Sequence, residues 1–192
     1  SIYKIKKSKI FFFLISSLGC HFSSYETPYK KLVYANENYL SNLSNSYILR
    51  LPSIWGLKEK SSNPKGLIGH LIYSVVTGKE VDIYGNMNTL RNYLWVDSVS
   101  KSIYDLAFSY ESLQKNNIYN FVSIFTHRIS ELISIVKHIT KKKIIYKIKS
   151  SEPFEQESYS NKASNGIDIK VLSCIKTEIS SVWKDLSQNY RS

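Results

Sequence analysis

Hydroxyl groups and a guanidinium group are the side chains of this sequence most suited to chemistry or binding. Ser16 and Ser17 directly follow the apolar run Ile10–Ile15, the pattern that a brief buried strand produces. Ligands of open α/β sheets bind beyond the carboxyl ends of strands. A reactive hydroxyl would be useful there, so both serines are candidate functional residues. Guanidinium groups are of interest as well, because a planar guanidinium suits phosphate oxygens.

Other kinds of site find little support in the sequence. Cys20 and Cys174 have no metal-ligand spacing and form no disulfide framework, so a reducing compartment is the default expectation. No Cys/His cluster, Gly-x-Ser-x-Gly nucleophile or internal repeat is present. The Gly-rich turn that lets a backbone approach a dinucleotide pyrophosphate is also absent. We therefore expect no metal site.

The candidate serines must be positioned by the first elements of the chain. Residues 9–15 predict a buried parallel strand, and residues 29–43 predict a helix. Residues 48–51 predict a second strand, which Pro52 ends. We expect Arg50 in that strand to form an ordinary salt bridge with a neighbouring carboxylate. The predicted helix has an apolar set that could supply its buried face: Leu32, Val33, Ala35 and Leu40.

Two further strands and a helix surround Arg91. Val81–Tyr84 alternates as a short strand, and Gly85–Asn86 supplies a turn. Leu90–Val96 predicts the next strand. Asp97 predicts a helix N-cap, because its carboxylate can accept hydrogen bonds from free backbone N–H groups of the first turn.

The remaining elements are predicted from apolar periodicity. A helix begins at Gly66 and ends at a C-cap, Gly78. A basic run, Lys141–Lys143, suits the carboxyl end of a later helix. The other predicted elements are a strand at 117–122, a helix at 129–139, a strand at 144–148 and short helices at 167–175 and 179–186.

The composition predicts a globular domain with a basic surface. The chain has 192 residues, of which 43% are hydrophobic, and a net charge of +11. A polyanion partner is one interpretation of that charge. We prefer a compositional bias with solvated lysines, because the charge lies in short runs without a nucleic-acid-binding motif.

The N-terminal residues also mimic the signal peptide of a lipoprotein. Lysines at 4–9 precede the apolar run, and Leu18-Gly19-Cys20 follows it. The run is only six residues long, which is far too short to span a bilayer. The elements downstream favour the strand, and a secreted lipoprotein is the less favoured alternative.

The ordered set of motifs resembles the NAD-dependent epimerase/dehydratase family, the sugar-nucleotide type of extended short-chain dehydrogenase/reductases. The resemblance runs from about Lys9 to Trp183 and corresponds to the C-terminal part of the family, without its N-terminal Gly-rich motif. No single motif is specific, but their order is. The motifs are Ser-Ser after the first strand, Thr-Pro-Tyr at 27–29, ILRLPSIWG at 48–56, RNYLWVD at 91–97 and NIYNFV at 117–122.

By resemblance, Tyr29 is the family's catalytic phenol and a cofactor contact, and Ser16 or Ser17 is its hydroxyl partner. In the family, a Lys one helical turn later lowers the phenol pKa and holds the nicotinamide ribose. Val33 stands at that position, and Leu18 is another occupant of the hydroxyl position. A surface tyrosine at a helix start is the alternative interpretation of Tyr29.

The resemblance also implies a cofactor and a substrate. NAD or NADP would lie beside Pro52 and Ser53. A nucleoside-diphosphate sugar would contact Ser53, Gly66, Leu67 and Arg91, with Arg91 on the diphosphate. The alternative for Arg91 is an ion pair with a nearby carboxylate.

We therefore predict an α/β fold, a partial Rossmann-like doubly wound parallel sheet with a smaller α/β substrate-binding domain. Residues 1–56 would be the remnant of the NAD(P)-binding domain, and residues 57–192 the substrate-binding part, interleaved with the last Rossmann elements. The predicted function is Tyr-assisted hydride transfer on a nucleoside-diphosphate sugar, or descent from such an enzyme. The alternative is an inactive fragment that only binds a ligand or partner. We expect a cytoplasmic protein without nucleic-acid or membrane partners. A homodimer is one oligomeric state that the resemblance allows.

Overall fold

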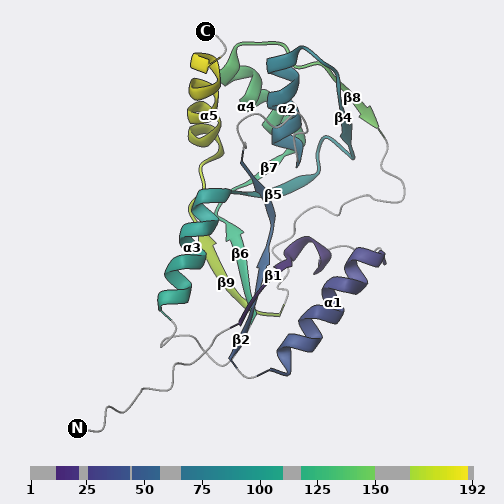
Figure 1. Cartoon of the computed structure of the whole chain (residues 1–192). Coiled ribbons are helices and arrows are strands. Elements are labelled where there is room, and N and C mark those ends of the chain that lie inside the picture. Colours follow the sequence, from purple (N-terminus) through teal and green to yellow (C-terminus); the bar gives the residue numbers. More distant parts are fainter. Residues whose placement is uncertain are drawn as a thin grey trace, which may run out of the picture.

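The computed structural model describes residues 12–21, 26–43, 45–56, 66–109, 118–149 and 165–189. Its strands and helices alternate along the chain (Figure 1). The strands are β1 (Phe12–Ser17), β2 (Ser46–Leu51), β3 (Ser53–Trp55), β4 (Val81–Tyr84), β5 (Leu90–Trp95), β6 (Ile118–Ser123), β7 (Thr126–Arg128), β8 (Tyr146–Lys149) and β9 (Ile167–Val171). The helices are the short 3₁₀ helix η1 (Leu18–His21) and α1 (Pro28–Ser41), α2 (Gly66–Thr77), α3 (Val96–Phe108), α4 (Ile129–Thr140) and α5 (Ile175–Asn189).

Four parallel strands form the largest sheet, in the order β1-β2-β6-β9. Its register places Ser16 of β1 beside Arg50 of β2, and Arg50 beside Asn120 of β6. Helix α1 lies on one side of this sheet and α3 on the other (Figure 1). Because both faces are covered, every residue of β2 is buried. The predicted doubly wound parallel sheet is confirmed.

Two smaller sheets belong to the other half of the molecule. In the first, β5 pairs with β3 in parallel and with β7 antiparallel. In the second, β4 pairs with β8 in parallel. Helices α2, α4 and α5 pack against these strands and against one another (Figure 1). This half is the smaller α/β part that the sequence predicted.

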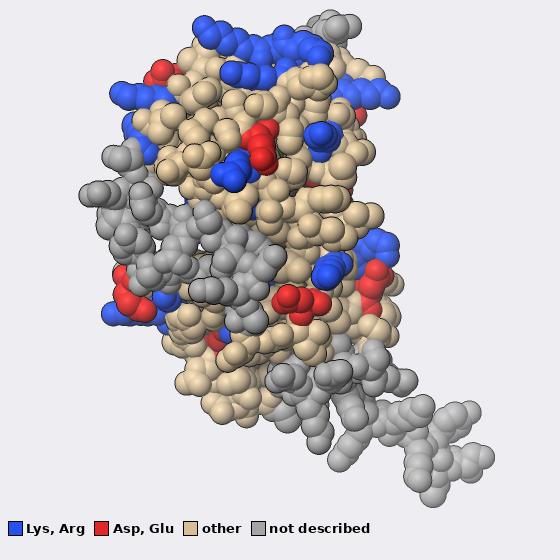
Figure 2. Space-filling view, turned by 180° about the vertical axis from the view of Figure 1, so that it is seen from behind, with Lys and Arg blue, Asp and Glu red and all other residues tan. Residues whose placement is uncertain are grey.

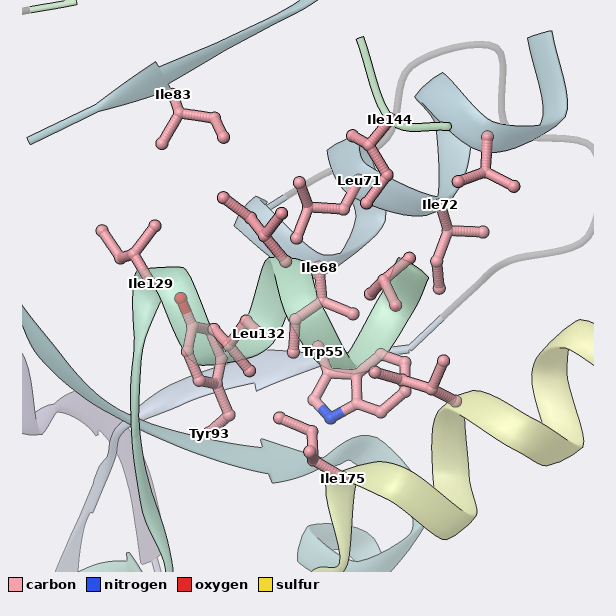
Figure 3. Packing of buried hydrophobic residues seen from close by; sticks show 14 residues of the cluster. Trp55, Ile68, Leu71, Ile72, Ile83, Tyr93, Ile129, Leu132, Ile144 and Ile175 are labelled. Carbon is pink, nitrogen blue, oxygen red and sulfur yellow. The ribbon is translucent and has the colours of Figure 1, made fainter. Parts of the chain in front are cut away.

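Two hydrophobic clusters meet at β5. The larger one contains Trp55, Ile68 and Leu132 and fills the space between α2, α4, α5 and the small sheets (Figure 3). The second packs β2, β6 and β9 against α3. Successive side chains of a strand point to opposite faces, so Tyr93 enters the first cluster and Leu94 the second. Strand β5 therefore joins the two cores.

Several predicted boundaries are confirmed by local geometry. Gly78 adopts a φ of 68° after α2, and its N–H donates to the carbonyl of Ser74 at 2.9 Å. A residue with φ in this region ends a helix most easily when it has no Cβ. Lys141 ends α4 with a φ of 56°, and its N–H donates to the carbonyl of Lys137.

The predicted helix at 167–175 is wrong. Ile167, Ile169 and Val171 alternate with polar residues and form β9, which pairs with β6. Strand pairing prevailed because an alternating segment can place one face on the core. The single helix α5 begins only at Ile175. The short strands β3 and β7 were not predicted.

The predicted N-cap at Asp97 is also wrong. Helix α3 begins one residue earlier, at Val96, and Trp95 occupies the cap position without a side-chain cap. The carboxylate of Asp97 accepts a hydrogen bond from the Trp95 indole N–H at 3.0 Å instead. Asp97 therefore lies inside the first turn, where a negative charge still suits the helix dipole.

The first strand and helix are more exposed than predicted. Strand β1 is parallel to β2 as expected, but it lies at the edge of the sheet, with Ile15 54% exposed. Helix α1 buries only Val33 and Glu37, while Leu32 is 58% exposed. Residues at i and i+4 share one narrow stripe of a helix, so the predicted buried face at 32–40 was too wide.

Both cysteines are free, Cys20 buried and Cys174 exposed. Within the described ranges, no helix combines the length and apolar character needed to span a membrane.

Candidate functional site

The carboxyl ends of β1 and β2 form one edge of the largest sheet. Ser17 lies beside Leu51 in register, so the residues that follow, Pro52 and Ser53, leave the sheet at the same edge as the two serines. Ser16, Ser17 and Pro52 are half-buried, and Ser53 is exposed. The structure therefore brings together the strand end with the two predicted catalytic serines and the strand end predicted for cofactor contact.

A buried carboxylate holds this edge to helix α1. Glu37 is 5% exposed and accepts three kinds of hydrogen bond. Ser16 Oγ donates to Glu37 Oε1 at 2.5 Å, and His21 Nε2 lies 3.1 Å from the same oxygen. Arg50 donates from Nη2 to Glu37 Oε2 at 2.6 Å and from Nε to both oxygens. We call Ser16, His21, Glu37 and Arg50 the Glu37 cluster.

The cluster keeps Glu37 ionised. Burial alone would raise the pKa of this carboxyl, but hydrogen bonds from His21, Arg50 and Ser16 lower the pKa to about 2. The expected salt bridge of Arg50 is confirmed, and its partner is Glu37. The hydroxyl hydrogen of Ser16 is already donated to a carboxylate, so this hydroxyl serves the scaffold.

Tyr29 lies outside the Glu37 cluster. It is 61% exposed in the first turn of α1, which Thr27 caps by accepting a hydrogen bond from the Lys30 N–H at 3.0 Å. The side chain of Lys30 reaches Glu26 Oε1 at 3.6 Å and lies over the ring of Tyr34. Lys30 is thus directed along α1 and away from the position of the family's lysine.

The position that the resemblance predicts for the family's lysine holds an apolar side chain. Val33 is 8% exposed and shares its stripe of α1 with Glu37. Leu18 is 1% exposed, so it packs in the interior and offers no hydroxyl. The described residues of this edge therefore do not supply the cation that would hold a nicotinamide ribose beside Tyr29. In this respect they do not fit a bound NAD or NADP.

A second group of polar side chains surrounds Arg91 on β5. Arg91 is half-buried, and burial lowers the pKa of its guanidinium. Tyr93, two residues on and therefore on the same face, is 7% exposed. Burial raises the pKa of Tyr93 to about 12, although Arg91 acts in the opposite direction. The phenol of Tyr93 therefore stays neutral beside the guanidinium.

His127 is the cross-strand neighbour of Arg91 in the β5–β7 pair. Directly opposed residues of antiparallel strands share a face, with Cβ atoms about 5 Å apart. His127 Nδ1 lies 3.8 Å from Glu131 Oε2. Burial lowers the pKa of His127, Glu131 raises it, and Lys176 lowers it. We call Arg91, His127 and Lys176 the Arg91 group. These residues lie beside the first turns of α4 and α5, where the Glu131 carboxylate also approaches His127.

The other predicted substrate contacts lie on elements next to this group. Ser53 of β3 is in register with Tyr93 of β5. Gly66 opens α2, which packs against β3, and Leu67 follows it half-buried. The two predicted sets share Ser53. Otherwise one set lies at the ends of β1 and β2, and the other lies around β5.

His21, Glu37 and His127 are polar residues of these places that were not predicted as site residues. His21 and Glu37 meet only because β1, η1, α1 and β2 pack together, and no short spacing signals that. His127 lies on β7, which pairs antiparallel with β5. Recognising β7 as a strand in the sequence would have placed His127 opposite Arg91. Among the described residues, no group of His, Cys, Asp and Glu could hold a metal ion.

The sequence matches the model of the NAD dependent epimerase/dehydratase family over residues 17–121. The match spans more than half of the 192 residues, so the chain belongs to this family. A comparison of the sequence with curated proteins finds no match.

Solved structures show the same fold. The UDP-glucose 4-epimerase from Thermotoga maritima, solved with UDP-glucose, has a TM-score of 0.71 and 16% identity over 93% of this chain and 64% of that one. The dTDP-glucose 4,6-dehydratase from Bacillus anthracis, in complex with NAD, has a TM-score of 0.71 and 13% identity over 92% of this chain and 61% of that one.

A third similar structure is the UDP-N-acetylglucosamine 4-epimerase from Methanobrevibacter ruminantium, in complex with UDP-N-acetylmuramic acid. Its TM-score is 0.70, with 20% identity over 92% of this chain and 63% of that one. The chain thus spans 61–64% of the length of these three proteins. At such identities the similarity concerns the fold.

Proposed function

We propose that this chain binds a nucleoside-diphosphate sugar in the way of the substrate-binding part of a sugar-nucleotide epimerase or dehydratase. The Arg91 group is the observation that carries this proposal. A half-buried guanidinium faces His127 across two strands, close to the first turns of two helices. Helix N-termini and guanidinium groups both favour phosphate oxygens.

The family membership supports the same substrate class. Two of the similar epimerases were solved with a UDP-sugar or a UDP-amino-sugar derivative. On this proposal, Arg91 contacts the diphosphate, and Ser53, Gly66 and Leu67 line the sugar-nucleotide site. If Arg91 instead forms an ion pair with a nearby carboxylate, its guanidinium does not contact the diphosphate.

Thermal unfolding with added ligand tests the proposal. UDP-glucose, GDP-mannose and dTDP-glucose are added separately, and one of them should raise the midpoint by several degrees. A ligand at about a hundred times its Kd stabilises a protein by about 2.7 kcal/mol. Absence of any shift with all three would overturn the proposal.

A pair of arginine variants assigns the binding to Arg91. Arg91→Ala should weaken binding about tenfold to hundredfold, because a hydrogen bond to a charged group contributes about 1.5–3 kcal/mol. Arg128→Ala is the matched control. Arg128 follows His127 on β7, and its Nε lies 3.9 Å from Glu131 Oε1, so this variant removes a nearby guanidinium that already approaches a carboxylate. Equal losses in the two variants would contradict the assignment.

For catalysis, we infer that hydride transfer through Tyr29 is impaired in this chain. Val33 places no cation near the phenol, and Ser16 donates to Glu37. Of the two serines predicted as the hydroxyl partner of Tyr29, Ser17 is then the one that remains. An impaired enzyme is intermediate between an active enzyme and a protein that only binds a ligand. Turnover of the Val33→Lys variant distinguishes these cases.

The domain division stays part of this proposal. Residues 1–56 would belong to the cofactor-binding domain and residues 57–192 to the substrate-binding part with interleaved Rossmann strands. A cytoplasmic location and a homodimer are likewise proposed. Exposed Leu32 and Tyr39 on α1 offer apolar surface for a second copy, and sedimentation equilibrium would measure the mass in solution.

A further inference from the structure

Lysines gather at the end of the molecule that lies away from both candidate sites. The stretch Lys137–Lys149 contains six lysines and no Asp or Glu. It runs from the last turn of α4 through a short connection into β8. Seen from behind, blue side chains line the end of the molecule where α4 and α5 terminate in Figure 1, and few red ones accompany them (Figure 2).

Five of these lysines form no ion pair within the part of the chain that the structure describes. Lys149 pairs with Asp82 at 2.6 Å. The others form no ion pair with any residue that the structure describes, and all are exposed. By contrast, Lys101 pairs with Asp105 on its own helix, and Lys30 of α1 pairs with Glu26, which precedes that helix. We call the five unneutralised residues the lysine patch: Lys137, Lys141, Lys142, Lys143 and Lys147.

The backbone beneath the patch is held in place. Ser74 Oγ donates to the carbonyl of Ile145 and accepts from its N–H, both at 3.0 Å. The same carbonyl accepts a bond from the Val81 N–H at 3.0 Å, and Ile144 is 3% exposed. Because this connection is already ordered, binding through it needs little further loss of backbone entropy.

Aromatic and aliphatic side chains lie among the lysines. Lys142 Nζ lies 5.3 Å from the ring centroid of Trp183, and Lys137 Nζ lies 5.9 Å from that of Tyr146. These two rings are half-buried under the lysine stems. Ile145 is 37% exposed and Ile148 is 51% exposed. The patch therefore combines free positive charge with apolar side chains at the surface.

We propose that the lysine patch binds the surface of an anionic lipid bilayer. Positive charge is attracted to acidic lipid headgroups, and exposed apolar side chains can enter the boundary between headgroups and acyl chains. A nucleic acid would use the charge but gain nothing from isoleucine, and the half-buried rings cannot stack on bases. The expectation of no membrane partner rested on the lack of a spanning segment, and a surface contact needs none.

Vesicle cosedimentation of the full chain tests the proposal. The vesicles contain phosphatidylcholine alone, or phosphatidylcholine partly replaced by phosphatidylglycerol. We expect binding only to the anionic vesicles, and weaker binding as salt is added, because salt screens surface charges. No binding to anionic vesicles, or equal binding to both kinds, would overturn the proposal.

A pair of triple variants locates the contact. Lys141→Gln, Lys142→Gln and Lys143→Gln together should weaken vesicle binding about a hundredfold, since each lysine near an anionic surface contributes about fivefold. Lys30→Gln, Lys31→Gln and Lys101→Gln remove the same charge from α1 and α3 and should change binding little. Equal losses in the two triples, or tighter binding to a DNA duplex than to anionic vesicles at the same salt, would overturn the proposal.

Discussion

The Glu37 cluster and the Arg91 group use their charges in opposite ways. In the Glu37 cluster, every charged atom meets a partner within the protein, and the carboxylate and guanidinium side chains are about 6–7% exposed. In the Arg91 group, Arg91 is only half-buried, and burial lowers the pKa of His127, while Glu131 raises it and Lys176 lowers it. The first arrangement suits a scaffold, and the second suits an anionic ligand.

The Glu37 cluster holds β1, α1 and β2 together without using the side chain at position 33. Arg50, Glu37 and Ser16 join β2, α1 and β1 whether or not a lysine follows Tyr29. Val33 fills the lysine position with an apolar side chain on the buried stripe of α1. The fold of the edge therefore does not depend on the groups that would perform hydride transfer.

The largest effect is expected from removing the charge of Glu37. Glu37→Gln leaves the buried guanidinium of Arg50 without a counter-charge, and breaking a buried pair in this way costs about 3–5 kcal/mol. Urea unfolding measures the loss. Asp105→Asn, which breaks the exposed Lys101–Asp105 pair, should cost at most about 0.5 kcal/mol. Similar small values for both variants would contradict a scaffold role for the cluster.

Acid should weaken the same cluster. The pKa of Glu37 is about 2 in the folded protein against 4.5 for an ordinary glutamate. A carboxyl with a lowered pKa contributes stability that is complete above pH 4.5 and is lost as the pH falls toward 2. The free energy of unfolding, measured across this range, should fall more steeply for the parent protein than for Glu37→Gln. Parallel curves would show that Glu37 is not the titrating group.

Much of the fold could be predicted because local patterns and tertiary packing agree. Val81–Tyr84 and Leu90–Trp95 are strands in the structure as the alternation indicated. The helix predicted at 167–175 was wrong for a physical reason. Residues 167–171 alternate between apolar and polar side chains and pair with β6, but the spacing of so few apolar residues also fits a helix. A pattern of this length does not decide between the two.

The candidate site was only partly predictable. Arg91 was identified because its type and its place in a family motif are visible in the sequence. The partners of Glu37 come from positions 16, 21 and 50, and only the packing of four elements joins them. His127 opposes Arg91 through a three-residue strand that is too short to show a period.

A smaller effect is expected from restoring the family's lysine. In a chain extended by a Gly-rich dinucleotide-binding segment, Val33→Lys should raise NAD-dependent turnover of a nucleoside-diphosphate sugar, because a cation one turn from Tyr29 stabilises its phenolate. The new charge is partly compensated by Glu37, which is four residues later on the same stripe. Val33→Met, of similar polarity to the parent residue, is the control and should leave turnover unchanged. If Val33→Lys also leaves it unchanged, the alignment of Tyr29 with the catalytic phenol is wrong.

The smallest effect concerns the pH dependence of ligand binding at the Arg91 group. Burial and Lys176 lower the pKa of His127, so the free protein holds this side chain neutral at a pH where an ordinary histidine is partly charged. A bound diphosphate would favour the charged form and raise that pKa, so binding takes up a proton. Affinity for the sugar nucleotide should therefore increase as the pH falls from the pKa of His127 in the complex toward its pKa in the free protein. Isothermal titration at several pH values measures the slope, and His127→Asn should flatten it while Arg128→Ala keeps it. A slope that persists in His127→Asn would assign the proton to another group and remove His127 from the binding face.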